Sequence, residues 1–373
     1  MKDNQLYYFD NNATTKLSLN VSKAMAAAAL YDYGNPSSIY SFGIRSKNLI
    51  QNARKQVAKI FQADPEQIIF TGSATESNNT IIYSALLQNA ERKTILYSAV
   101  EHPSVYQTLM HYQTKGYRLL KIPVSEKGID EEYIFGNLSQ DVALVTIMNV
   151  NNETGQIFNI NRIFNKIKEF DPCIICHSDV VQAIGKINIS TNAVDYMTAS
   201  AHKFHGPKGV GCIYKNKSMQ LNPLMFGGMQ ECGLRPGTEN VSGIIGMGVA
   251  SSEIFEIRNE HEKLRRLQNK LEDALSECDS YIVCKDTDRV PGVSNIGFKG
   301  IEANNLVLKL NRYHIYVSTG SACSSNRIGI SRILQEMRIP PIYSSTIRIS
   351  MSKYTSEEEV DYLIEKLKLI IKN

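Results

Sequence analysis

The chain has 373 residues, a net charge of +4 at neutral pH and seven cysteines. This length exceeds what one hydrophobic core usually serves, so we expect two domains. The small charge does not indicate nucleic-acid binding, and no apolar run is long enough to span a bilayer. The first residues contain nothing typical of a signal peptide. An odd number of scattered cysteines indicates a reducing compartment, so we expect a cytoplasmic protein.

Along the first two thirds of the chain, short apolar segments alternate with segments of helical character. Several of the apolar segments are apolar on both faces, which is typical of a mostly parallel sheet covered by helices. We therefore expect an α/β fold. In chain order, the expected elements are an extended segment near 6–10, helices at 21–31 and 44–61, a strand at 68–70, a helix to about Gln88, strands at 94–98 and 142–150, a helix through Lys168, and strands at 174–175, 196–199 and 210–214.

The last third of the chain predicts a second, smaller α+β domain. A long helix at 244–275 leads into it, and strands follow at 293–298, 315–318 and 346–350. A final helix starts at Thr355, with Glu358 reinforcing its cap. We expect a large domain of residues 15–255 and a small domain of residues 1–14 and 256–373.

Polar side chains follow the expected strands where each strand ends, and in a parallel sheet these ends meet at one edge. Small residues at 72–77 join a strand to a helix, a turn that lets backbone N–H groups approach an anion. Asp179 also ends a strand, and an aspartate there can keep the ring nitrogen of a pyridinium cofactor protonated. His102, Asn152 and Gln182 could contact the same ring. Taken singly, each of these residues is better explained as a helix cap, a turn amide or a core histidine.

Lys203 lies between His202 and His205, just before a Gly-Pro-Lys-Gly turn. Burial lowers the pKa of a lysine and makes its amine available for a Schiff base. On this stretch alone, a solvated surface lysine is an equally good interpretation.

Cysteines occur in two informative settings. Cys323 lies among small polar residues, where an accessible and reactive thiol is expected. The segment Cys173-x-x-Cys176-His177 matches a haem-attachment pattern, but it is embedded in an apolar strand. We expect no haem and no metal site, apart from a transient contact of Cys323 with a cluster.

Together these motifs resemble the cysteine desulfurases, pyridoxal-phosphate enzymes of the class V aminotransferase group, over nearly the whole chain. The segment Gly320-Ser321-Ala322-Cys323 is similar to the nitrogen-fixation and iron–sulfur-cluster branch. The resemblance implies the fold type I of pyridoxal-phosphate-dependent transferases. It also implies removal of sulfur from L-cysteine, which gives L-alanine and a persulfide on Cys323. The sulfur would pass to an acceptor protein of iron–sulfur cluster assembly or tRNA thiolation.

The resemblance also implies roles for individual residues. Lys203 would carry the cofactor and remove the α-proton, and His102 would stack on the ring and assist proton transfer. Asn35 and Arg348 would bind the substrate carboxylate. Thr238 would reach the cofactor of a neighbouring subunit, which implies a homodimer with shared sites. The residues implied to bind the cofactor are Ala74, Thr75, Asn152, Asp179, Gln182, Ser200, His202, Lys203 and Thr238.

Three alternatives stay open on these grounds. A class V aminotransferase would not need Cys323, and a selenocysteine lyase would act on selenocysteine far better than on cysteine. A catalytically silent scaffold in a sulfur-transfer assembly is disfavoured because every expected cofactor group, Lys203 included, is present.

Overall fold

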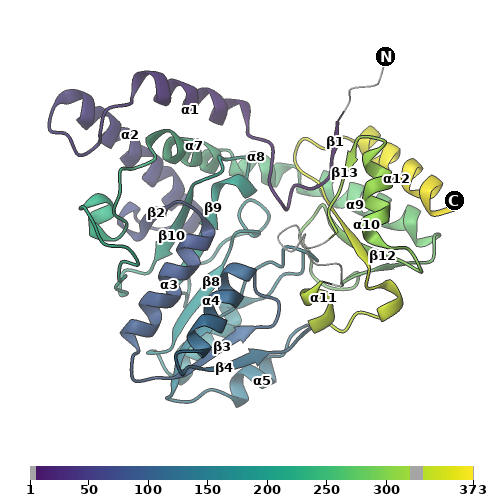
Figure 1. The fold of residues 1–373 in the computed structure, drawn as a ribbon, viewed down its shortest axis with the longest axis horizontal. Helices are drawn as coiled ribbons and strands as arrows, with labels where there is room; N and C mark the ends of the chain where they lie inside the picture. Colours follow the sequence, from purple (N-terminus) through teal and green to yellow (C-terminus); the bar gives the residue numbers. More distant parts are fainter. Residues whose placement is uncertain (1–5, 320–330, 373) are drawn as a thin grey trace.

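A seven-stranded sheet organises the larger part of the molecule in the computed structural model, which describes residues 6–319 and 331–372 (Figure 1). β10 runs antiparallel to both of its neighbours, and the other adjacent pairs are parallel. The prediction of an α/β fold with a mostly parallel sheet is confirmed. From one edge to the other the strands are β2 (Ile68–Thr71), β10 (Gly211–Lys215), β9 (Tyr196–Ser200), β8 (Ile175–Asp179), β7 (Val142–Thr146), β3 (Thr94–Ser98) and β4 (Arg118–Ile122).

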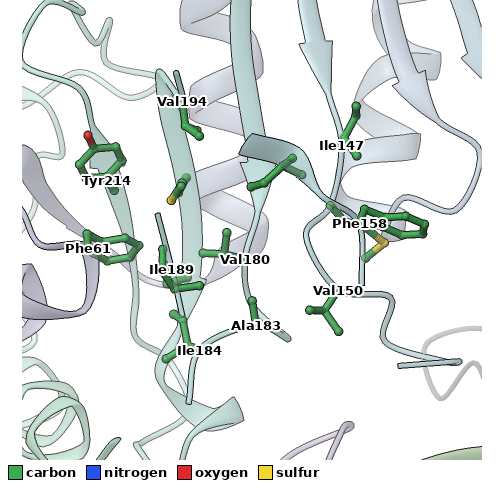
Figure 2. Close-up of a cluster of buried hydrophobic side chains, with 14 of the residues drawn as sticks. Phe61, Ile147, Val150, Phe158, Val180, Ala183, Ile184, Ile189, Val194 and Tyr214 are labelled. Carbon is green, nitrogen blue, oxygen red and sulfur yellow. The ribbon is translucent and has the colours of Figure 1, made fainter. Parts of the chain in front are cut away.

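Both faces of this sheet are buried along its inner strands, which explains their apolar character, whereas the edge strand β4 carries the exposed Arg118 and Lys121. Successive side chains of a strand point to opposite faces, so in β2 Ile69 packs into one apolar cluster while Ile68 and Phe70 pack into another. Figure 2 shows part of the second cluster, in which Phe61 and Tyr214 stack with ring centroids 5.4 Å apart. Two covered faces fix the sheet rigidly beneath the groups at its edge.

The helices that cover the sheet follow the expected amphipathic pattern. In α6 the buried residues Ile160, Ile163 and Ile167 recur at helical spacing, and Asn159 caps the helix. Within residues 6–319 and 331–372, none of the helices has the length and apolarity needed to span a membrane. The helices are α1 (Leu19–Tyr31), α2 (Ser41–Ala58), α3 (Ala74–Gln88), α4 (Pro103–Gln113), α5 (Glu131–Gly136), α6 (Ile160–Phe170), α7 (Val241–Ser252), α8 (Ile254–Asn259), α9 (His261–Ser276), α10 (Ala303–Asn311), α11 (Arg332–Glu336) and α12 (Glu357–Lys372).

The smaller part of the molecule contains an antiparallel sheet with its own apolar core. Phe9 from the first segment packs there together with buried residues between Leu264 and Ile370. Figure 1 shows the first strand, β1, and the last helix, α12, on this side. This arrangement supports the division at residues 14 and 255, which stays a prediction. The remaining strands are β11 (Ser280–Ile282), β12 (Val293–Phe298) and β14 (Thr346–Ser350) in that sheet, the parallel pair β1 (Tyr7–Tyr8) and β13 (Ile315–Tyr316), and the hairpin β5 (Val124–Ser125) and β6 (Gly128–Ile129).

The single helix expected at 244–275 is wrong, because the structure has three helices there. The chain leaves helical geometry at Glu253 and again at Glu260, where φ is near −90° and ψ is near 0°. The physical reason is that α7 packs on α1 and α2 in the larger part, whereas the leucines of α9 belong to the core of the smaller one. One straight helix could not pack into both of these cores.

The cap expected at Thr355 is also displaced by one residue. Ser356 Oγ accepts a hydrogen bond from Glu359 N, and Glu359 Oε2 accepts one from Ser356 N at 2.9 Å. This reciprocal pair is a capping box, so Ser356 and Glu359 take the roles expected of Thr355 and Glu358. Thr355 instead accepts a hydrogen bond from Ser352 N.

Candidate active site

Four adjacent parallel strands bring the predicted polar residues to one edge of the sheet. β9 ends at Ser200 and β8 ends at Asp179, and both residues are buried. The chain that leaves β7 reaches Asn152, and the chain that leaves β3 reaches His102. Because all four strands point the same way, these groups gather at the carboxyl edge, where such sheets place their ligands.

Lys203 lies at this edge on a short 3-10 turn, η3 (Ala201–Lys203), directly after β9. Its Nζ donates hydrogen bonds to the backbone carbonyls of Asn12 at 2.7 Å and Ala13 at 2.8 Å. The amine therefore points inward against the N-terminal segment. This placement disfavours the interpretation of Lys203 as a solvated surface lysine.

A hydrogen-bond chain connects Asp179 with His102. Asp179 Oδ2 accepts from Asn78 Nδ2 at 2.9 Å, and the same amide lies 2.8 Å from Ser104 Oγ. Ser104 Oγ in turn lies 2.8 Å from His102 Nδ1. The second oxygen of Asp179 accepts from Val181 N. The carboxylate and the imidazole are thus held in fixed orientations from both sides.

The first turn of α3 forms the part of the site that suits an anion. Gly211 pairs with Ser200 across the sheet, and a Cβ on Gly211 would lie 2.7 Å from the carbonyl carbon of Ser73 and 3.0 Å from Ala74 N. Only glycine therefore lets the start of α3 lie so close to the end of β9. The first N–H groups of a helix lack intrahelical partners, so those near Ala74 and Thr75 are available to a phosphate.

Arg348 reaches the site from β14 of the smaller part. Its guanidinium is buried, 2.6 Å from Asp10 Oδ1 and 3.1 Å from the backbone carbonyl of Asn152. Ser318 pairs with Arg348 through both backbone hydrogen bonds. A guanidinium in this position suits a substrate carboxylate.

The histidines of the site are neutral at pH 7. Burial lowers the pKa of His102, and the charges of Lys203 and Arg332 lower it further against the opposing charge of Asp179. Burial and then Lys203 lower the pKa of His202 to about 4. Ser104 N donates to Nδ1 of His102 at 3.2 Å, so the neutral ring carries its proton on Nε2, which can act as a donor.

The residues present fit pyridoxal phosphate. Lys203 supplies the amine, Asp179 the carboxylate for a ring nitrogen, and the start of α3 the anion site. Asn152 Oδ1 is buried and has no hydrogen-bond partner among the described residues. A buried polar atom of this kind is costly unless a ligand partners it.

An open groove leads away from this edge over α3 and α4. It encloses about 590 Å³ and is lined by Thr75, His102 and Leu224, among others. The site therefore has a route to its surroundings on the side of the anion-binding turn.

Three predicted site residues are not part of this cluster as described. Cys323 lies outside the described residues. Asn35 is exposed between α1 and α2, where its Oδ1 accepts from Ser37 N, and Figure 1 shows this connection far from β12, the partner strand of β14. Thr238 is exposed just before α7.

The Cys-x-x-Cys-His segment begins at the exposed Cys173 and then enters the interior of the sheet. Cys176 and His177 are both buried in β8, and the His177 ring lies between Thr146 Oγ1 and Thr198 Oγ1. Burial lowers the pKa of His177 to about 3 and raises the pKa of Cys176. Neither side chain is placed to attach a haem.

Three residues of the site were missed by the sequence analysis. Asn12 bonds Lys203, Gln182 and Lys186, and Asn78 bonds Asp179. The Asn11-Asn12 pair after an extended segment was a usable signal, because other site residues follow strands in the same way. Asn78 lies one helical turn after Ala74, so it shares the face of α3 that starts at the anion site. Nothing in the sequence distinguished Lys186.

The comparisons with known proteins cover nearly the whole chain. The sequence profile described as aminotransferase class-V matches residues 7–363. A cysteine desulfurase from a Nostoc species is 40% identical over 371 residues, which cover 98% of this chain and 92% of the relative. The cysteine desulfurase NifS of Azotobacter vinelandii is 38% identical with the same coverage. A solved structure described as a NifS-like protein superposes with a TM-score of 0.92 at 36% identity, covering 99% of this chain and all of the other.

Proposed function

This chain belongs to the aminotransferase class-V family, and from that premise we propose how its own residues carry out the reaction. The protein is a pyridoxal-phosphate-dependent cysteine desulfurase. The observation that supports our residue assignment best is the convergence of Lys203, Asp179 and Arg348 on one sheet edge. Asn12 and Asn152 connect Lys203 with Arg348 through hydrogen bonds, and Asn78 bonds Asp179.

The cofactor would be held at three points of this edge. Its phosphate would bind at the start of α3 with Ser200 and His202, and its ring nitrogen would face Asp179. Asn152 and Gln182 would bond its phenolic oxygen, and Lys203 would bind it covalently. When bound, the cofactor supplies an electron sink for negative charge at the α-carbon of the substrate.

The chain's own groups would then orient the substrate and move protons. Arg348 would hold the carboxylate of L-cysteine, with Asp10 fixing the guanidinium in place. Lys203 Nζ would accept the α-proton, and His102, whose neutral ring carries its proton on Nε2, would assist proton transfer from that nitrogen. Exclusion of water at this buried edge strengthens each of these electrostatic contacts.

The thiolate of Cys323 would attack the sulfur of the bound L-cysteine. A sulfur–sulfur bond forms, the carbon–sulfur bond breaks, and the products are L-alanine and an enzyme persulfide. The described chain on either side supports this role. Ser318 pairs with Arg348, and Ser331 Oγ donates to Glu153 Oε2 at 2.6 Å, so both flanks of residues 319–330 are bound at the site.

The site would be completed in a homodimer. Asn35 and Thr238 are exposed in the single chain, and two nearby segments carry large apolar side chains that a lone subunit would leave in water. Analytical ultracentrifugation should therefore show a dimer. The exposed apolar residues of these segments are Leu30, Tyr31, Tyr33, Ile39, Tyr40, Leu224, Met225, Phe226 and Met229.

The persulfide would pass its sulfur to an acceptor protein of cluster assembly or tRNA thiolation. The six cysteines of the described residues are all free thiols. A cytoplasmic location, with its reducing conditions, stays a prediction that agrees with these thiols.

The experiment that tests the function uses purified protein and L-cysteine. The protein should be yellow and, with a reductant, should release sulfide and alanine in equal amounts. Cys323→Ser should abolish sulfide release while leaving the colour, and Lys203→Ala should abolish both. Equal rates of sulfide release for Cys323→Ser and wild type would exclude the persulfide role. A much faster reaction with selenocysteine would indicate a selenocysteine lyase.

A further inference from the structure

Lys186 places a second buried amine beside the one that the reaction uses. It lies in the turn that follows β8, four residues after Gln182, and its Nζ is enclosed. Nζ donates to Gln182 Oε1 at 2.8 Å and to Asn12 Oδ1 at 2.7 Å. A buried ammonium group is expensive unless it is hydrogen bonded in this way. Its position therefore calls for a role beyond packing.

The bond to Gln182 determines which way that amide faces. The ammonium form of lysine only donates hydrogen bonds, so the atom of Gln182 that meets the charged Nζ is the oxygen. Gln182 Nε2 then lies on the other side, where it donates to the backbone carbonyl of Asn12 at 2.9 Å. If the amide were rotated by half a turn, its NH2 group would face the amine of Lys186, which is also a donor. Its oxygen would face the carbonyl oxygen of Asn12, which is also an acceptor. That arrangement loses two hydrogen bonds.

The orientation leaves the second N–H of Gln182 free to face the site. Nε2 carries two hydrogens, and the carbonyl of Asn12 takes one of them. The same carbonyl accepts from Lys203 Nζ, so Nε2 and the reactive amine share one acceptor. A ligand bound at Lys203 therefore has an amide donor beside it.

Lys186 lines a small cavity, and none of the described residues that line this cavity has an acidic side chain that could neutralise the amine. Burial, followed by the charges of Lys203 and Arg348, lowers the pKa of Lys186 to about 7. Lys186 and Lys203 line this small cavity of about 30 Å³, which lies between the two parts of the molecule. The other titratable residues that line it are His205, His261 and Lys353.

We propose that Lys186 is a positioning residue that fixes the Gln182 amide with its N–H toward the phenolic oxygen of the cofactor. This inference rests on the proposed function, because it takes the cofactor to lie between Lys203 and Asp179. A donor to that oxygen favours its deprotonated form, so the bound cofactor changes its protonation at a lower pH. Loss of Lys186 frees the amide to rotate and removes that preference.

The test is the pH midpoint of the visible absorption change of the holoenzyme. Lys186→Met keeps the apolar stem and removes the donors, and it should raise the midpoint by about one pH unit, the effect of losing one hydrogen bond to a charged group. Lys168→Met is the matched control, because Lys168 Nζ is also partly buried but bonds Asp195 Oδ2, a carboxylate that is not a site residue. It should lower stability without moving the midpoint.

A double variant decides whether Lys186 acts through Gln182. Lys186→Met should shift the pH midpoint in the Gln182→Leu protein by less than half of the shift that it causes in wild type. An equal effect in both backgrounds would mean that Lys186 acts only as a charge, and it would overturn the positioning role. The positioning role would also be overturned if Lys186→Met shows the visible absorption of the cofactor and has the pH midpoint of wild type.

Two further outcomes keep the test decisive. Lys186→Gln retains an amide donor and should show a smaller shift in the same direction, and it replaces Lys186→Met if that protein does not fold. If Lys186→Gln has the same pH midpoint as wild type, the positioning role of Lys186 is overturned. A wild-type protein without visible absorption would contradict the proposed function itself, which separates that failure from this one.

Discussion

The backbone carbonyl oxygen of Asn12 lies 2.7 Å from Nζ of Lys203, so the N-terminal segment and the reactive amine form one structural unit. The next carbonyl, that of Ala13, accepts from the same amine at 2.8 Å. Backbone groups are fixed by the fold and cannot rotate away. The position of the amine is therefore set by how residues 10–15 pack between the two parts of the molecule.

We expect Lys203→Ala to be affected in two separable ways. The variant should lose the visible colour and all sulfide release, because no other amine takes the place of Nζ. Without cofactor, it should also be less stable than wild type by about 1 kcal/mol, since the carbonyl of Ala13 loses a donor. Absorption spectra and urea denaturation of the cofactor-stripped proteins measure the two effects.

Lys203→Arg is the matched control for that experiment. A guanidinium keeps donors for the carbonyls of Asn12 and Ala13 but cannot lose its proton to form a Schiff base. The Lys203→Arg protein should be as stable as wild type without cofactor, but it should release no sulfide. If both variants are equally destabilised, the hydrogen bonds to the N-terminal segment do not contribute to the free energy of unfolding.

A second prediction concerns Arg332, which follows the segment of Cys323 closely in the chain. Its guanidinium donates to the carbonyls of Ala99 and Glu101, the latter at 2.5 Å, and stacks on the Tyr106 ring at 4.5 Å. Arg332→Met should slow alanine formation by on the order of 100-fold, the cost of a small misplacement of a reacting group. The cofactor absorption should stay, because these contacts do not include the residues proposed to bind it.

Rapid-quench measurement of alanine in a single turnover tests this second prediction. Arg162→Met is the control, because Arg162 is an exposed arginine that pairs with Glu131 at 2.5 Å on the surface. It should leave the rate unchanged. An Arg332→Met protein with wild-type single-turnover kinetics would show that the contacts of Arg332 do not position the thiol.

Much of the site could be predicted from the sequence because of a simple property of parallel sheets. Strand ends meet at one edge, so Asp179, Ser200, His102 and Asn152 could be grouped from their positions after apolar strands. The apolar strands also followed from burial on both faces. β4, with its exposed Arg118 and Lys121, lacked that pattern and was not predicted.

The rest depends on tertiary contacts that leave no local pattern. The amide of Asn12 meets Lys186 across 174 residues of chain, and nothing in the sequence around Lys186 indicates this contact. The break between α7 and α9 follows from their packing on two different cores, whereas helical periodicity runs through both. Asn35 and Thr238 lie outside the cluster in the single chain, which agrees with the proposed homodimer.

A third prediction tests the buried ion pair of the smaller part. Arg289 binds both oxygens of Glu272, at 2.8 and 2.9 Å, and both side chains are almost completely buried. Arg289→Met leaves a buried carboxylate without its partner and should lower the free energy of unfolding by about 3–5 kcal/mol at pH 7. Arg266→Met, which breaks an exposed pair with Glu357, should cost about 1 kcal/mol or less.

The loss in Arg289→Met should also depend on pH with a defined sign. Burial alone would raise the pKa of Glu272, but the hydrogen bonds and charge of Arg289, with Ser294 and Gln268, outweigh it and hold the pKa below its usual value. The pair therefore stabilises the fold above about pH 4.3, the unfolded value, and the contribution is lost as the pH falls through the folded pKa. Urea denaturation at pH 7 and pH 4 should show a smaller difference at the lower pH.

The last prediction concerns Glu101, which precedes His102 and is fully buried. Burial raises its pKa well above the usual value, against one hydrogen bond from Met148 N to Oε1 at 2.7 Å. Its Oε2 has no hydrogen-bond partner among the described residues. The folded state therefore favours the neutral acid to a higher pH than the unfolded chain does, whereas a glutamine at this position is neutral at every pH.

Glu101→Gln should therefore gain stability relative to wild type as the pH rises. The folded wild type binds a proton that the unfolded chain releases above about pH 4.3, so its free energy of unfolding falls by about 1.4 kcal/mol per pH unit until the folded pKa is reached. Urea denaturation at pH 5, 6, 7 and 8 should show a difference between the two proteins that grows and then levels off. Glu262→Gln, at an exposed position of α9, should keep a constant difference. A flat difference for Glu101→Gln would mean that Glu101 is ionised in the fold, and a donor for its second oxygen would then have to come from outside the described contacts.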